Sequence, residues 1–325
     1  MINSKKLQMA YKRYIKNFSE GLTLEKSLKK YEEAKIENSD IVENNETEKD
    51  HILLVNMYRI SSYWLSEWKH HVLIKGEENA MGLKQIQKVV FYQCMVRHIY
   101  KDRYPNMKLI HYSFDLNIVA LIHFNMYGWK KEEDVFFDFI EEYLVENIMK
   151  ANDWNKHIWY LFELYLRSSN KTIFGVNQNI HMIVKLKLEE KGMNYDLIPG
   201  ELGIYSEVLD RWNTPDLDEI TQLIGKMSEY HSMLAAELGQ SLEFGDFRYT
   251  FYPYEILFLL HVRKKQGLPN PTHFDDFLMN SPEAKIEIQD PEPYPDQDPI
   301  LQLVDGYYRK NYPEYIPNKY GMLFE

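Results

Sequence analysis

A row of carboxylates marks the stretch from residue 130 to residue 150. Asp134, Asp138, Glu142 and Glu146 recur at intervals of four residues, with Glu141 beside them. On an α-helix this spacing places the four side chains on one face. Each like-charged pair costs the helix about 0.2–0.5 kcal/mol, which makes the row a candidate surface for docking a basic partner by electrostatic complementarity. Surface charge is often neutral in its effect on stability, and this favours the simpler interpretation of a solvated face with basic neighbours on another helix.

The same carboxylates do not form a recognisable metal site. A di-iron bundle needs Glu-x-x-His pairs on two helices, and this segment contains no histidine. The chain also has no His-Glu-x-x-His pattern, acidic calcium loop, phosphate-binding Gly-Lys-Ser/Thr loop or Gly-x-Ser-x-Gly elbow. The sequence therefore predicts neither a metal ion nor a cofactor.

A possible nucleophile is the single cysteine, Cys94, which stands four residues before His98. This spacing permits the thiolate–imidazole pair of cysteine hydrolases, but the apolar residues around Cys94 favour a buried structural thiol. Four polar residues interrupt a second apolar stretch and are expected to be hydrogen-bonded core groups: Asp115, Asn117, His123 and Asn125. We therefore assign no catalytic residue, and predict that the chain is not an enzyme.

A second candidate surface is the proline-rich segment 282–299, which we call the strap. Its five prolines lack backbone donors, so it is expected to lie extended over the surface. Stiffness lowers the ordering cost of binding, which makes its acidic and aromatic residues candidates for partner contact: Asp290, Glu292, Tyr294, Asp296 and Asp298. A rigid connector without a partner is the equal alternative.

Charge and composition narrow the class of partner. Three stretches, 37–50, 130–150 and 283–298, carry more negative charge than the whole net charge of -11, so the rest of the chain is slightly basic. The isoelectric point near 5.5 argues against a broad nucleic-acid footprint. One cysteine, no secretory leader and no apolar stretch of membrane-spanning length predict a cytoplasmic protein with no membrane partner.

Helical periodicity dominates the chain and predicts an all-α fold, either a multi-helix bundle or stacked helix pairs. The clearest stripes are Leu53 to Val72 and Val135 to Ile148, each apolar at spacings of three and four. Helices are predicted over 4–18, 23–36, 79–103, 111–127, 130–149, 153–168, 176–191, 200–212, 216–240, 252–266 and 299–309. Strand patterning is thin, with 285–289 as the best candidate.

The predicted organisation has three parts. Residues 1–36 form a basic helical arm, and residues 37–50 form an exposed acidic linker because six acids and three asparagines accompany few apolar residues. Residues 51–325 form the main helical domain and include the strap.

One stretch carries a family resemblance. Residues 252–260 read Tyr-Pro-Tyr-Glu-Ile-Leu-Phe-Leu-Leu and lead through 261–266 into Gly267-Leu268-Pro269, with Phe-Leu-Met-Asn-Ser-Pro following at 277–282. This stretch resembles the C-terminal portion of helical immunity proteins encoded beside bacterial polymorphic or type VI secretion toxins. The resemblance implies a non-enzymatic antitoxin that covers the active site of a cognate toxin or locks its conformation.

The resulting hypothesis is an immunity protein that binds and neutralises a cognate bacterial toxin, with a basic effector domain, through acidic surfaces and without catalysis. Electrostatic steering would make that association fast and salt-sensitive. Two alternatives stay open: a helical enzyme whose site forms around Cys94 and His98 or around Asp115 and His123, and a regulatory adaptor protein.

Overall fold

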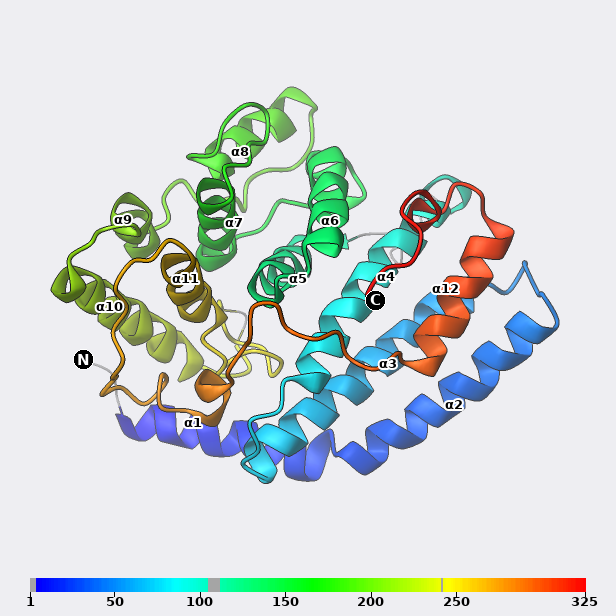
Figure 1. The fold of residues 1–325 in the computed structure, drawn as a ribbon, viewed down its shortest axis with the longest axis horizontal. Helices are drawn as coiled ribbons and strands as arrows, with labels where there is room; N and C mark the ends of the chain where they lie inside the picture. Colours follow the sequence, from blue (N-terminus) through cyan, green and yellow to red (C-terminus); the bar gives the residue numbers. More distant parts are fainter. Residues whose placement is uncertain (1–3, 105–111, 241) are drawn as a thin grey trace. The chain divides into compact units, whose positions relative to one another are not determined.

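The computed structural model describes residues 4–104, 112–240 and 242–325, and these residues are predominantly helical (Figure 1). Twelve α-helices lie within this part of the chain, together with one pair of two-residue strands. The predicted all-α fold is confirmed. None of the described helices is long and apolar enough to cross a membrane.

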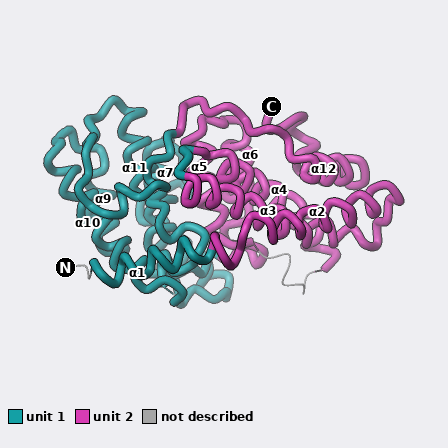
Figure 2. The backbone as a smooth tube through the Cα atoms, turned by 90° about the horizontal axis from the view of Figure 1, so that it is seen from below, with its two compact units in different colours: residues 1–17, 76–78, 151–287 teal, residues 18–75, 79–150, 288–325 magenta. Residues whose placement is uncertain are grey.

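Contacts divide the chain into two compact units that interleave in sequence (Figure 2). Unit 1 comprises residues 1–17, 76–78 and 151–287, and unit 2 comprises residues 18–75, 79–150 and 288–325. The basic arm expected over residues 1–36 is therefore shared between the units, and so is the strap.

Unit 1 is built on helices that bury aromatic and aliphatic side chains. They are α1 (Ser4–Lys16), α7 (Lys156–Ser168), α8 (Ile180–Glu190), α9 (Ile204–Arg211), α10 (Leu217–Ala235) and α11 (Tyr254–Lys265), followed by a 3-10 helix at Pro282–Lys285. Helix α7 contacts α8, α9 and α11, while α10 contacts α1, α9 and α11. Asp216 begins α10 by accepting hydrogen bonds from the backbone N–H groups of Asp218 (2.9 Å) and Glu219 (3.1 Å), as an N-cap should.

Unit 2 contains the longest helices. Its α-helices are α2 (Leu24–Glu43), α3 (His51–Lys69), α4 (Met81–Arg103), α5 (Phe114–Tyr127), α6 (Lys130–Tyr143) and α12 (Pro299–Asn311). Helix α3 packs between α2 and α4, and α12 contacts α2, α3 and α4. Short π-helical turns occur at Asn17–Gly21 and His70–Ile74, and a 3-10 helix occurs at Ile316–Lys319.

The two apolar stripes seen in the sequence are buried, as predicted. On α3, Leu53, Met57 and Ile60 have no solvent exposure. On α6, Phe136 and Ile140 are likewise inaccessible to solvent. Each stripe turns inward because residues three and four apart share one face of a helix.

The prediction of an irregular linker over residues 37–50 is wrong for residues 37–43, which continue α2. Asn38 is fully buried, and its side-chain oxygen accepts a hydrogen bond from Asn56 of α3 (2.7 Å). Ile41, one turn later, is also buried. Packing on α3 thus extends the helix, although the composition of this segment suggests an exposed linker.

The prediction of a strand over residues 285–289 is also wrong. Residues 285–289 contain no strand: Lys285 ends a 3-10 helix, and 286–289 have no regular structure. The two strands are instead β1 (Tyr112–Ser113) and β2 (Met149–Lys150), which pair in parallel with Tyr112 opposite Met149. Their two-residue length leaves no period-2 pattern to detect.

Candidate functional site

The acidic face predicted on α6 is exposed to solvent. Asp138, Glu141 and Glu142 all project from the side of α6 opposite its buried stripe. Within the described residues, Asp138 and Glu141 make neither a hydrogen bond nor an ion pair through their carboxylates. Glu142 accepts a hydrogen bond from the Tyr143 hydroxyl (2.7 Å). That hydroxyl in turn accepts from Lys101 of α4 (3.2 Å), so a basic neighbour from another helix reaches the Glu142 end of the face but forms no ion pair with Asp138 or Glu141 among the described residues.

The two ends of the predicted row differ from its centre. Asp134 is half-buried and accepts a hydrogen bond from Lys130 in the same helix (2.7 Å). Helix α6 ends at Tyr143 rather than at residue 149, so Glu146 lies in the following turn, where it is exposed. The turn redirects the chain so that Met149–Lys150 pairs with Tyr112–Ser113.

Glu292, one of the strap residues predicted to contact a partner, is engaged within unit 2. Its carboxylate accepts a hydrogen bond from Lys84 of α4 (2.9 Å), and the two side chains are only 10% and 7% exposed. Its backbone N–H donates to the carbonyl of Tyr127 (2.8 Å), while the indole N–H of Trp129 donates to its carbonyl (2.8 Å). Glu292 thus fastens the strap to α4 and to the end of α5.

Asp298 is fixed equally firmly at the end of the strap. Its Oδ1 accepts hydrogen bonds from the first backbone N–H groups of α12, at Ile300 (2.9 Å) and Leu301 (3.0 Å). Its Oδ2 accepts from the Tyr31 hydroxyl (2.9 Å) and the Trp64 indole (2.8 Å). The carboxylate of Asp298 is therefore a buried helix cap with all its lone pairs directed at protein donors.

The remaining strap candidates divide into one anchored residue and two exposed ones. Tyr294 donates a hydrogen bond from its hydroxyl to Glu132 of α6 (2.8 Å) and stacks near Trp129, with ring centroids 4.9 Å apart. Asp290 and Asp296 are solvent-exposed. Of the five strap residues predicted to bind a partner, these two present the most accessible carboxylates.

Cys94 has the environment of a structural thiol. Its side chain is fully buried and donates a hydrogen bond to the side-chain oxygen of Asn117 (3.1 Å). Burial raises the pKa of the thiol to about 12, so the nucleophilic thiolate is scarce at neutral pH. His98 makes no hydrogen bond to Cys94 within the described residues, and burial lowers the pKa of its imidazole. The pair lacks the arrangement of a hydrolase dyad.

Three of the four polar residues of α5, Asn117, His123 and Asn125, are buried as predicted, whereas Asp115 is half-buried in the first turn, and the Nδ2 of Asn117 has no hydrogen bond among the described residues. His123 is fully buried, and its Nδ1 lies 2.6 Å from the carbonyl oxygen of Val119 one turn earlier. Desolvation lowers the pKa of His123 to about 4, which keeps the ring neutral. Asn125 donates to Glu133 of α6 (3.3 Å), and Asp115 accepts from the hydroxyl of Ser113. These contacts are internal to unit 2.

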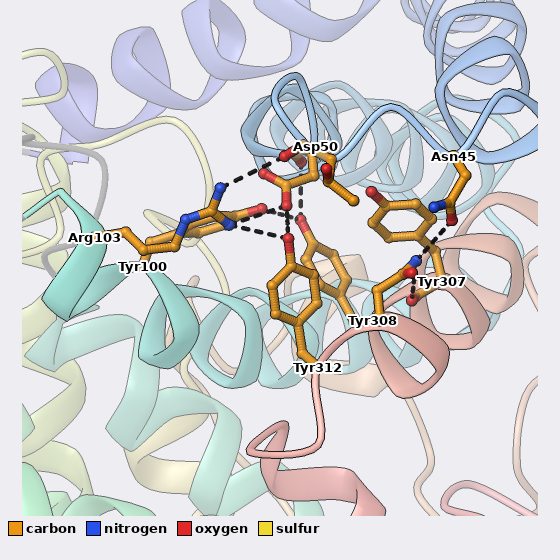
Figure 3. A network of polar contacts seen from close by, with 9 residues as sticks. Asn45, Asp50, Tyr100, Arg103, Tyr307, Tyr308 and Tyr312 are labelled. Atoms are coloured by element: carbon orange, nitrogen blue, oxygen red, sulfur yellow. Dashed lines mark hydrogen bonds and ion pairs between the residues drawn. The ribbon is translucent and has the colours of Figure 1, made fainter.

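A network of polar contacts joins the start of α3, the end of α4 and the end of α12 (Figure 3). The fully buried carboxylate of Asp50 accepts hydrogen bonds from Arg103 (3.1 Å) and from the hydroxyl of Tyr312. Its backbone carbonyl accepts from the hydroxyl of Tyr308 (2.9 Å), which lies 2.8 Å from that of Tyr100. Burial raises the pKa of Tyr100 and of Tyr308, so both remain neutral hydrogen-bonding groups.

Unit 1 contains a second buried network that the sequence does not reveal. The Nδ1 atom of His231 lies 2.7 Å from Glu255, and its Nε2 lies 2.8 Å from the carbonyl of Thr250. His157 likewise bridges Glu243 (3.0 Å) and the hydroxyl of Tyr254 (2.7 Å). The ring of Phe244 stacks on both imidazoles, with centroids 4.1 Å from His157 and 3.6 Å from His231. These contacts tie α7, α10 and α11 together.

A small pocket in unit 2 is the other feature that sequence reasoning missed. It has a volume of about 40 Å³ and is lined by Lys88, Tyr92, Gln297, Asp298, Leu301, Gln302, Asp305, Met322 and Leu323. Lys88 is 4% exposed, yet within the described residues it makes neither a hydrogen bond nor an ion pair. Burial lowers the pKa of its ammonium group, and the nearby carboxylates, led by Asp298, oppose that shift.

No three His, Cys, Asp or Glu side chains converge as a metal-binding group in the described ranges. Comparisons with known protein families, with curated proteins and with solved structures give no match for this chain.

Proposed function

We propose that this chain is a binding protein that docks a basic protein partner on the exposed acidic face of α6, without catalysing a reaction. The observation that carries the proposal is the group Asp138, Glu141 and Glu142, which stands exposed on a helix fixed from behind by buried aromatic residues. Such a surface is preorganised, because binding need not order the helix that presents it.

The energetics of α6 support the same conclusion. Asp138 and Glu142 are four residues apart on one face, and repulsion between like charges at this spacing costs about 0.2–0.5 kcal/mol. A basic surface placed against them would remove that repulsion and would speed association through long-range attraction. The exposed Glu146 in the next turn adds to the same negative charge.

The partner we propose is a cognate toxin with a basic effector domain, so the chain would act as its immunity protein. The resemblance of residues 252–282 to helical immunity proteins supports this choice. A regulatory adaptor would use the same surface for another basic protein, and the identity of the bound partner distinguishes the two roles.

The test compares two charge-reversal variants with equal net charge. One carries Asp138→Lys, Glu141→Lys and Glu142→Lys on α6, and the control carries Asp196→Lys, Glu201→Lys and Asp210→Lys, three exposed positions of unit 1. The tagged chain is first purified from its native host at low salt, and the co-purifying protein is identified by mass spectrometry.

Affinity and association rate are then measured for the identified partner at low and high salt. We expect the α6 variant to bind about tenfold or more weakly, mainly through slower association, and to lose most of its salt dependence. The control variant should stay close to the parent protein. Equal affinity of the two variants would remove the α6 face from the interface.

A further inference from the structure

Helix α4 carries two buried lysines one turn apart, and only one of them has a partner. Lys84 donates to the carboxylate of Glu292 (2.9 Å) and to the carbonyl of Pro293 (3.0 Å). Lys88 is buried to the same degree but has no hydrogen bond or ion pair among the described residues. Its nearest described aromatic contact is the ring of Phe324, whose centroid lies 5.2 Å from Nζ.

Leaving a buried ammonium group unpaired is costly, because desolvation is not offset by a hydrogen-bonded counter-charge. Proteins therefore rarely bury a lysine without either a partner or a function. Lys88 lines a pocket, so a ligand entering that pocket could supply the missing acceptor.

The shape of the pocket allows such entry. Lys88, Tyr92, Leu301 and Leu323 are buried, whereas Gln297, Gln302 and Met322 on the rim are exposed. The small volume of about 40 Å³ favours a small occupant over a drug-sized one.

The polar lining favours an anion over a cation. Both carboxylate oxygens of Asp298 already accept hydrogen bonds from backbone, tyrosine and tryptophan donors. Asp305 accepts from the side chain of Arg309 through Oδ2 (2.6 Å), whereas its Oδ1 is buried without a hydrogen bond among the described residues. The uncommitted donors are the ammonium of Lys88 and the hydroxyl of Tyr92, which makes no hydrogen bond within the described residues. Two donors of this kind match the two oxygens of a carboxylate.

The charge of the lining also limits the charge of the anion. The carboxylates of Asp298 and Asp305 would repel a doubly charged phosphate more strongly than a singly charged group. Leu301, Leu323 and Met322 provide an apolar wall for a short aliphatic tail.

We propose that the pocket between α4 and α12 binds a short-chain monocarboxylate, whose oxygens accept hydrogen bonds from Lys88 and Tyr92 and whose carbon chain packs on Leu301 and Leu323. This site is separate from the acidic face of α6 and does not depend on the proposed function.

Butyrate is a suitable probe, and the methyl group of Met322 at the rim is a local reporter. The full chain is labelled with ¹³C at its methionine methyl groups, and the Met322 resonance is assigned with a Met322→Leu variant. We expect saturable movement of this resonance when butyrate is added, and little movement when uncharged butanamide is added. Movement with both compounds in the same concentration range would overturn the role of the charged amine.

Variants of α4 test the residue that carries the charge. Lys88→Met should raise the butyrate concentration at half-saturation by about tenfold or more, because a hydrogen bond to a charged group is lost. Lys101→Met removes the same charge from the same helix outside the pocket and should leave the half-saturation concentration unchanged. Unchanged binding in Lys88→Met would overturn the proposal.

Two further results complete the test. Tyr92→Phe keeps the ring and removes only the hydroxyl, so a several-fold weaker affinity is expected even if Lys88→Met folds poorly. If no methionine resonance moves at butyrate concentrations of tens of millimolar, the pocket holds water only and the proposal is wrong.

Discussion

Lys84 and Lys88 lie one helical turn apart on α4 and show two ways in which a protein can bury an ammonium group. Lys84 meets Glu292, a residue 208 positions away in the sequence, and their ion pair holds the strap against α4. Lys88 lines a pocket and makes no hydrogen bond or ion pair within the described residues. The ion pair of Lys84 stabilises the fold. The ammonium group of Lys88 is the donor that would bind the proposed carboxylate ligand.

The meeting of α4 and α12 shows the same contrast on a larger scale (Figure 1). At the C-terminal ends of the two helices, Arg103 and Tyr312 both donate to Oδ2 of Asp50, whose Oδ1 is buried without a hydrogen bond among the described residues. Nearer the N-terminal ends, Lys88 and Asp305 line the pocket. The charged side chains Arg103 and Asp50 are paired within the protein, whereas the ammonium group of Lys88 is not, so Lys88 marks the more informative site.

The largest effect is expected from breaking the Lys84 ion pair. Lys84→Met leaves the carboxylate of Glu292 buried without its cation, so the free energy of unfolding should fall by about 3 kcal/mol. Chemical denaturation measures this change. The double variant Lys84→Met, Glu292→Gln should recover part of the loss, because it no longer buries an unpaired charge. A loss below about 0.5 kcal/mol in the single variant would show that the pair is as weak as a surface salt bridge.

At Lys88, substitution by methionine is expected to change the free energy of unfolding in the opposite direction. Lys88→Met replaces an unpaired ammonium with an apolar chain of similar length, so the free energy of unfolding should stay the same or rise by about 1 kcal/mol. The same denaturation experiment, run beside Lys84→Met, gives a direct comparison at matched burial. A loss of more than about 1 kcal/mol would mean that contact with Phe324 stabilises Lys88, which would weaken the contrast with Lys84.

The fold class could be predicted from the sequence, but the difference between a paired Lys84 and an unpaired Lys88 could not. The stripes on α3 and α6 are visible because burial follows the helical period, and the exposed carboxylates of Asp138 and Glu141 follow from the same period. Lys84 and Lys88 look alike in the sequence, since the partner of Lys84 comes from a distant strap. The burial of Asn38, within the predicted linker 37–50, is hidden in the sequence for a similar reason, because the donor to its side-chain oxygen is Asn56 of another helix.

The smallest expected effect is a change with pH in how much Lys88 affects the free energy of unfolding. Burial lowers the pKa of Lys88 below its value in the unfolded chain, against the attraction of four carboxylates: Asp298, Glu132, Asp305 and Glu325. Between the lowered folded pKa and about 10.4 the unfolded state binds more protons, so stability rises with pH through this window. The penalty for burying the charged amine is fully present at lower pH and fades as the amine is deprotonated.

The gain from Lys88→Met should therefore be largest near neutral pH and should shrink by a fraction of a kcal/mol toward pH of about 9.5. Denaturation of the parent protein and of the variant at both pH values gives this difference, and other titrating groups cancel because both proteins share them. Lys101→Met, whose lysine is only half-buried, should show a difference that hardly changes with pH. A gain that grows with pH would mean that the folded state favours the charged amine, and Lys88 would then have a counter-charge comparable to that of Lys84.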